Sequence, residues 1–165
     1  MGGKDAIIVD ADADVDSAVE GVAQAAFSFQ GQKCSACSRA IVDERIYEIF
    51  LEKLKARVEK ITIGDPAENA NMGAVINEGS MKSILDYIEV GKKDGRVITG
   101  GGPAKNAGEG YFLQPTVIAD IPAGSRLEQE EVFGPLLAVI KSKNYDHALE
   151  IANDTEFGLT GAVYT

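Results

Sequence analysis

The sequence predicts an α/β protein with three layers, in which a mostly parallel sheet carries helices on both faces. Two observations predict this class. Short runs of β-branched residues alternate along the chain with segments whose apolar residues recur at spacings of three and four. One of the short runs, at residues 136–140, is apolar from end to end, as is typical of a buried strand. Strand and helix patterns that alternate in this way favour parallel strands joined by crossover helices.

The first half of the chain predicts two strands and three helices. The strands are expected at residues 5–10 and 40–42, and the helices at residues 15–29, 45–61 and about 78–93. Acids between residues 10 and 14 can cap the first helix, and Gly95 ends the third. Residues 62–77 are rich in glycine, proline and asparagine and therefore predict a surface loop.

The second half predicts four extended segments and two helices. Extended segments are expected at residues 96–99, 111–118, 136–140 and 161–165, with a short polar helix at 125–131 and a longer helix at 145–153. Pro115 indicates an edge strand or a bulge. The glycine-rich residues 100–110 lack the Gly-Lys-Ser/Thr ending of a phosphate-binding loop, and no helix pattern follows them, so we expect a hairpin-type loop.

Composition indicates a soluble, cytoplasmic protein of one domain. The chain has 165 residues, of which 45% are hydrophobic and 25% charged, as in ordinary globular proteins. Two cysteines do not make a disulfide framework, which favours a reducing compartment. No apolar run approaches the ~20 residues of a membrane span, and no leader sequence is evident. The net charge of -10 argues against nucleic acid, so we expect small molecules or proteins as partners.

Both cysteines lie within residues 29–39, where a helix pattern ends. A thiol attacks only as the thiolate, so a reactive cysteine needs cations or backbone amides nearby. Cys34 is preceded by Lys33 and followed by Arg39, while Gly31 allows a sharp turn and small residues leave room for a substrate. The alternative is that both cysteines are small buried hydrophobes, which is the commonest fate of free cysteine.

Three other interpretations of this region stay open on the residues alone. The spacing of Cys34 and Cys37 allows a thiol–disulfide redox pair, although such a pair opens a helix after a strand rather than following a helix. The chain could also be a non-catalytic interaction domain. A zinc site would need four ligands, and the chain offers two cysteines and His147, which occupies a polar position on a predicted helix. We therefore expect no metal and a solvated His147.

Two motifs together identify a family. Residues 31–34 read Gly-Gln-Lys-Cys, and residues 130–135, about a hundred positions later, read Glu-Glu-Val-Phe-Gly-Pro. By these motifs, in this order and separation, the whole chain resembles the aldehyde dehydrogenase superfamily. Residues 29–39, 87–92, 110–112 and 157–161 look most like the branch that oxidises glutamate semialdehyde in proline catabolism.

The resemblance implies roles for four residues. Cys34 would be the nucleophile that attacks the carbon of a small aldehyde substrate, and NAD would be the cofactor. Glu131 matches the residue that holds the ribose hydroxyls on the nicotinamide side, and Phe133 matches the ring that borders the ribose and the nicotinamide. Ser35 matches a position that helps to bind the substrate carboxylate, whereas Cys37 has no catalytic role in the pattern.

The resemblance also implies that residues 1–165 form a single catalytic domain, a fragment without the NAD-binding domain and without the C-terminal substrate and oligomerisation segments. The family's general base is a glutamate immediately before Leu-Gly-Gly-Lys, and the corresponding text here begins at Met1. We therefore expect the isolated chain to be inactive, because water activation is missing. The whole enzyme is expected to be a homo-oligomer, and the isolated chain exposes faces open to self-association.

Overall fold

The computed structural model describes residues 2–105 and 107–165 and has six strands in one sheet. The strands follow the order β3-β4-β5-β2-β1-β6, and every neighbouring pair is parallel except β3 and β4. Their bounds are Ala6–Val9 (β1), Arg39–Asp43 (β2), Arg96–Thr99 (β3), Thr116–Ala119 (β4), Leu136–Ser142 (β5) and Gly161–Tyr164 (β6). The predicted fold class, a mostly parallel α/β sheet, is confirmed.

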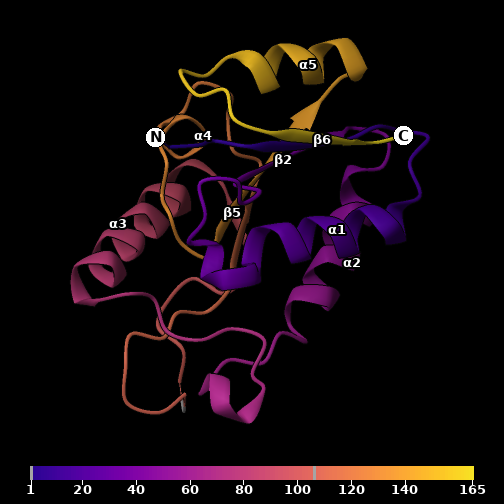
Figure 1. Cartoon of the computed structure of the whole chain (residues 1–165). Helices are drawn as coiled ribbons and strands as arrows, with labels where there is room; N and C mark the ends of the chain where they lie inside the picture. The colour runs from indigo at the N-terminus through magenta and orange to yellow at the C-terminus, as the bar shows by residue number, and fades with distance from the viewer. Residues whose placement is uncertain (1, 106) are drawn as a thin grey trace.

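Helices cover both faces of this sheet (Figure 1). The α-helices are Val15–Phe27 (α1), Tyr47–Val58 (α2), Glu78–Asp94 (α3), Arg126–Gln129 (α4) and Tyr145–Asn153 (α5), with short 3-10 turns at Ser28–Gly31 (η1) and Pro66–Glu68 (η2). Ile7 and Val9 pack with α1 and α2, whereas Ala6 and Ile8 pack with α3, α4 and α5. Because side chains alternate along a strand, a strand between two helical layers must be apolar on both sides.

Most element boundaries agree with the prediction within two residues, and the difference that matters most is at residues 111–115. Residues 111–115 are not a strand: Leu113 makes only an isolated bridge to Pro103, and β4 begins at Thr116. Pro115 therefore precedes a strand in the interior of the sheet rather than marking an edge, since its missing N–H would break the ladder. The first helix ends at Phe27, and the short helix α4 is not simply polar, because Leu127 and Glu128 are buried. No helix in the described parts of the chain is long and apolar enough to span a membrane.

The end of α1 turns the chain sharply into the cysteine region. Asp14 caps the start of the helix by accepting a hydrogen bond from the amide of Ser17 at 2.8 Å. After the helix, Phe29, Gln30 and Gly31 have φ angles of 54°, 58° and 66°. At Gly31 an added Cβ would lie 2.2 Å from the carbonyl oxygen of Gly134. The backbone of η1 therefore rests directly on the connection before β5, which no side chain at position 31 would permit.

We expect Gly31→Ala to lower the free energy of unfolding by at least about 2 kcal/mol, because the substitution combines left-handed strain with a backbone clash. Two glycines provide matched controls for urea denaturation. Gly124 has a φ of 76° with nothing within 4 Å of its added Cβ, so Gly124→Ala should cost only about 1 kcal/mol of strain. Gly102 has open space and no positive φ, so Gly102→Ala should be close to neutral. Equal effects at positions 31 and 124 would contradict the close contact.

Candidate active site

Cys34 lies at the tip of a tight turn. The amide of Ala36 donates to the carbonyl oxygen of Lys33 at 3.1 Å, which places Cys34 and Ser35 at the two central positions. Both residues are exposed. The amide of Cys37 then donates to the carbonyl of Ala25 in α1 at 3.2 Å and ties the end of the turn to the helix. The turn therefore presents a thiol and a hydroxyl side by side to solvent.

Cys37 has a different environment. It is 4% exposed, and its Sγ donates to the carbonyl oxygen of Arg39 at 3.4 Å. Burial raises the pKa of the Cys37 thiol to about 12. A buried thiol held in its protonated form is a poor partner for disulfide exchange. The geometry therefore speaks against a redox pair of Cys34 and Cys37, and it agrees with Cys37 as part of the core.

Glu131 is joined to the cysteine turn through Gly3. The amide of Gly3 donates to Oε1 of Glu131 at 3.0 Å. On its other side, an added Cβ at Gly3 would lie 2.1 Å from the carbonyl oxygen of Cys34. The chain before β1 is thus inserted between the turn and the segment after α4. Residues 3, 34 and 131, far apart in the sequence, meet at one place.

Phe133 completes this arrangement. Its backbone has a φ of 56°, and its side chain is 46% exposed. The next residue, Gly134, is buried under Ile84 of α3, where an added Cβ would lie 2.4 Å from the isoleucine Cδ1. A small hollow between the two segments is lined by Gly3, Lys33, Glu131 and Phe133, among other residues. The structure therefore brings the turn that carries Cys34 and Ser35 close to the segment that carries Glu131 and Phe133.

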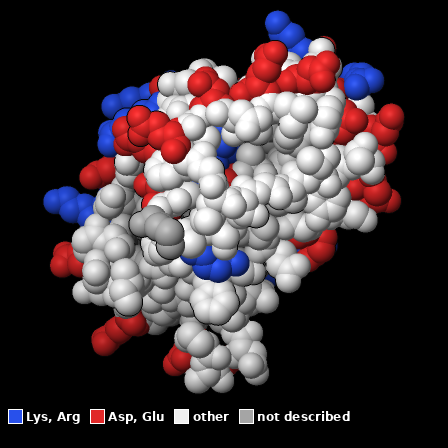
Figure 2. All heavy atoms as spheres, turned by 45° about the horizontal axis from the view of Figure 1, so that its top comes forward, with Lys and Arg blue, Asp and Glu red and all other residues white. Residues whose placement is uncertain are grey.

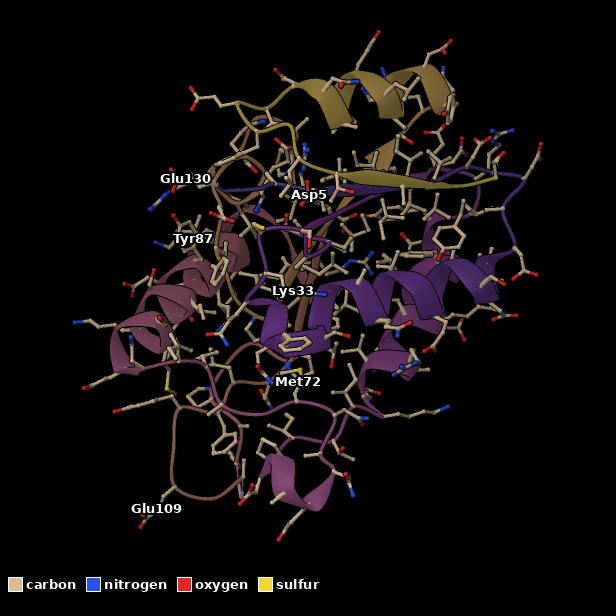
Figure 3. The ribbon with its side chains drawn as sticks, in the orientation of Figure 1. Asp5, Lys33, Met72, Tyr87, Glu109 and Glu130 are labelled. Carbon is tan, nitrogen blue, oxygen red and sulfur yellow. The ribbon has the colours of Figure 1, made fainter. Side chains whose placement is uncertain are left out.

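The segment before Glu131 is anchored to α3. The hydroxyl of Tyr87 donates to Oε2 of Glu130 at 2.5 Å, and Nε of Arg126 donates to the same oxygen at 2.9 Å. These two hydrogen bonds, the one from Tyr87 first, hold the pKa of the Glu130 carboxyl below its usual range. Figure 3 shows Tyr87 on α3 directed toward Glu130. This anchor limits the freedom of the adjoining Glu131.

Arg39 does not face the cysteine turn as we expected. It was a candidate cation for Cys34, but its guanidinium is buried and pairs with Glu128 of α4 at 2.5 Å. Lys33, the other candidate, stays near the turn with its Nζ 5.9 Å from the centroid of the Phe29 ring. His147 is partly exposed at the start of α5, where its Nδ1 accepts from the amide of Lys143 at 3.2 Å. No group of three or more His, Cys, Asp or Glu side chains among residues 2–105 and 107–165 could hold a metal ion.

Sequence reasoning missed Lys4. This lysine is 2% exposed and lies two residues before β1. Burial lowers the pKa of its amine to about 8, and the positive charge of Arg39 acts in the same direction, while Glu128 and Glu131 act in the opposite one. The only signal in the sequence was a Lys-Asp pair before an apolar run, and charged residues are also common at solvated strand ends.

Lys4 predicts a specific pH dependence of stability. A lysine in the unfolded chain has a pKa near ~10.4, so between about pH 8 and 10.4 the unfolded state binds more protons than the folded state, and raising the pH stabilises the fold. We expect the free energy of unfolding of the wild type, measured relative to Lys4→Met, to rise by roughly 1.4 kcal/mol for each pH unit in this window. Urea denaturation at several pH values measures it, with Lys60→Met as an exposed control. Parallel pH profiles for the wild type and Lys4→Met would contradict the buried amine.

The comparisons with known proteins agree with this geometry. The model of the aldehyde dehydrogenase family matches residues 1–165. The chain is 51% identical over 164 residues to the 1-pyrroline-5-carboxylate dehydrogenase of Geobacillus thermodenitrificans and 52% identical over 166 residues to that of Bacillus pumilus, covering 99% and 100% of this chain and 32% of each relative.

Solved structures give the same result. A Thermus 1-pyrroline-5-carboxylate dehydrogenase with bound NAD superposes with a TM-score of 0.97 at 49% identity, covering 100% of this chain and 32% of that one. Proline utilization A from Bdellovibrio bacteriovorus gives 0.93 at 46% identity, covering 100% of this chain and 17% of that one. The chain therefore spans about a third of the length of the curated relatives that it matches. On this evidence, the chain belongs to the aldehyde dehydrogenase family.

Proposed function

We propose that residues 1–165 are the cysteine-bearing catalytic domain of a longer NAD-dependent dehydrogenase that oxidises glutamate semialdehyde, the open form of 1-pyrroline-5-carboxylate, to glutamate. One observation carries the proposal: the exposed turn of Cys34 is packed, through Gly3, against the segment that presents Glu131 and Phe133. Relatives that share about half of the residues of this chain are 1-pyrroline-5-carboxylate dehydrogenases, which supports the substrate.

In this proposal Cys34 performs the covalent step. Its thiolate attacks the aldehyde carbon and forms a thiohemiacetal, oxidation of which leaves a thioester that water cleaves to the carboxylic acid. NAD, when bound, accepts the hydride. The exposed hydroxyl of Ser35, next to Cys34 on the turn, is suited to donate a hydrogen bond to the carboxylate at the other end of the substrate.

Glu131 and Phe133 are suited to the cofactor. The carboxylate of Glu131 is held at Oε1 by the amide of Gly3 and remains partly exposed, so it can accept hydrogen bonds from ribose hydroxyls. The exposed ring of Phe133 offers an apolar face to a ribose or nicotinamide ring. Both residues border the same small hollow, so a cofactor that lies across its mouth would contact them together.

We further propose that the whole enzyme is a homo-oligomer in the cytoplasm. For the 165-residue chain alone we propose self-association. Strand β6 is at the end of the strand order and is hydrogen-bonded to β1 on one side, while Val163 on it is 44% exposed. An exposed strand edge of this kind can pair with another chain.

Thiol labelling tests the cysteine assignment. At neutral pH we expect iodoacetamide to alkylate Cys34 in the folded chain and to leave Cys37 unmodified, because Cys37 is buried and its pKa is raised to about 12. Peptide mass spectrometry reads both sites, and labelling in urea shows that Cys37 reacts once it is exposed. Alkylation of Cys37 at the rate of Cys34 in the folded chain would contradict the assignment. With glutamate semialdehyde and NAD we expect the same 165-residue chain to give no sustained NADH.

A chimera tests the function. The corresponding third of the Geobacillus thermodenitrificans relative is replaced by residues 1–165, and NADH formation from glutamate semialdehyde is followed. We expect turnover, and we expect Cys34→Ala in the chimera to reduce kcat by at least about 1000-fold, while Cys37→Ala keeps most of it. A chimera that folds and binds NAD without producing NADH, or that stays active as Cys34→Ala, would overturn the proposal.

A further inference from the structure

Phe157, in the connection between α5 and β6, lies against the same glycine segment as Glu131. An added Cβ at Gly2 would lie 3.0 Å from Cε1 of the Phe157 ring and 2.6 Å from Oε2 of Glu131. The ring and the carboxylate therefore face the same side of Gly2, the side on which any other residue would carry its side chain. Figure 1 shows this connection, in yellow, passing near the beginning of the chain. The missing side chain of Gly2 thus lets both groups approach the backbone before β1.

The connection that carries Phe157 is fastened at both ends. Nε2 of Gln129, the last residue of α4, donates to the carbonyl oxygen of Asp154 at 2.6 Å. The amide of Thr160 donates to Oδ1 of Asp5 at 2.9 Å. Each anchor lies two residues along the chain from one partner of the hydrogen bond that Glu131 accepts. The place of the ring is therefore set by the same two segments that meet at Glu131.

The carboxylate of Glu131 lies among other acids. A cavity of about 500 Å³ beside the ring is lined by Tyr87, Gln129, Glu130, Glu131, Glu156 and Phe157. Figure 2, with the side of α5 turned forward, shows acidic side chains gathered at several places on this part of the surface. Among residues 2–105 and 107–165, the amide of Gly3 is the one hydrogen-bond donor to this carboxylate. Because like charges repel, the carboxylate favours turning away from its neighbours unless the contacts at Gly2 and Gly3 hold it.

We infer that Phe157 is a positioning residue, whose ring keeps Gly2 and Gly3 against the carboxylate of Glu131 and so fixes the direction in which that carboxylate meets the cofactor. The inference rests on the proposed role of Glu131 in cofactor binding. Without the ring, residues 2 and 3 lose the surface that they rest on, and the hydrogen bond from Gly3 to Oε1 opens more often. A carboxylate that is already oriented binds better, because less freedom is lost when the ligand arrives.

Exchange of the Gly3 amide with water tests the positioning in the 165-residue chain without any cofactor. This amide donates to Glu131, so its exchange rate, measured by NMR, reports how often the hydrogen bond is open. We expect Phe157→Ala to speed the exchange at least about fivefold, as Glu131→Ala does, and Phe157→Tyr to keep the wild-type rate. Leu159→Ala, which removes a 47% exposed side chain from the same connection, is the matched control and should have no effect. An unchanged rate in Phe157→Ala, or an equal acceleration at the buried amide of Ile41, would overturn the inference.

Gly2→Ala disturbs the same contact from the opposite side. Gly2 has no positive φ, and the atom nearest to its added Cβ, Oε2 of Glu131, is the end of a flexible side chain. We therefore expect the variant to fold with an unchanged urea midpoint, while the displaced carboxylate lets the Gly3 amide exchange at least about fivefold faster. A wild-type exchange rate in Gly2→Ala would count against the inference, since the carboxylate would then not be held at this glycine.

The chimera described above relates the contact to the cofactor. We expect Phe157→Ala to lower kcat/KM for NAD at least about fivefold, and to lower it no further in a chimera that already carries Glu131→Ala, because the ring acts through that carboxylate. Losses that multiply in the double variant would contradict the inference. If Glu131→Ala alone leaves kcat/KM for NAD unchanged, the function proposed for Glu131 is wrong, whereas the positioning of its carboxylate is still decided by the amide exchange of Gly3.

Discussion

The rest of this structure depends on the ion pair and hydrogen bonds that the buried guanidinium of Arg39 makes. It lies at the start of β2, five residues after Cys34, and binds the carboxylate of Glu128 in α4 together with main-chain carbonyls before β1 and at the end of α5. Four elements that are far apart in the sequence therefore share one cation. Removing one partner of such a buried pair typically costs about 3–5 kcal/mol, because the remaining charge is left uncompensated. The pair thus fixes the position of α4 relative to the sheet, and with it the position of the segment that begins at Glu130.

The same cation links the stability of the fold to its chemistry. Its hydrogen bond to the carbonyl oxygen of Lys4 holds the chain next to Gly3, which in turn contacts both Cys34 and Glu131. Its remaining positive field acts on Lys4, which has no counter-ion of its own among the described residues. One buried charge therefore supports the turn that carries Cys34 on one side and, together with burial, lowers the pKa of the Lys4 amine on the other. Gly3 and Gly31 have no Cβ, so the backbone segments around the cysteine turn can lie in direct contact.

Sequence periodicity was sufficient for the fold class and for most elements, because each buried strand or amphipathic helix carries its own pattern. The bounds of β3 and α5 were predicted to the residue. The prediction of one extended strand over residues 111–118 was wrong for residues 111–115, and the reason is physical. Tyr111 and Phe112 have strand-like side chains, but the partner strand β5 begins only at Leu136 and pairs with Thr116, so nothing extends the ladder beyond Pro115. Whether an extended segment becomes a strand depends on a neighbour that local sequence does not specify.

The candidate site, like the fold, was only partly predictable from the sequence. The roles predicted for Cys34, Ser35, Glu131 and Phe133 come from two short motifs and stay predictions. The motifs did not reveal the Gly3 bridge or the burial of Lys4 and Arg39, since these depend on which segments meet across more than a hundred residues of chain. A glutamate in a four-residue helix carries no local mark of a buried ion pair, and a lysine before a strand carries none of a lowered pKa. Charge burial is a property of the assembled layers, so the groups most altered by folding are the ones that local sequence identifies least well.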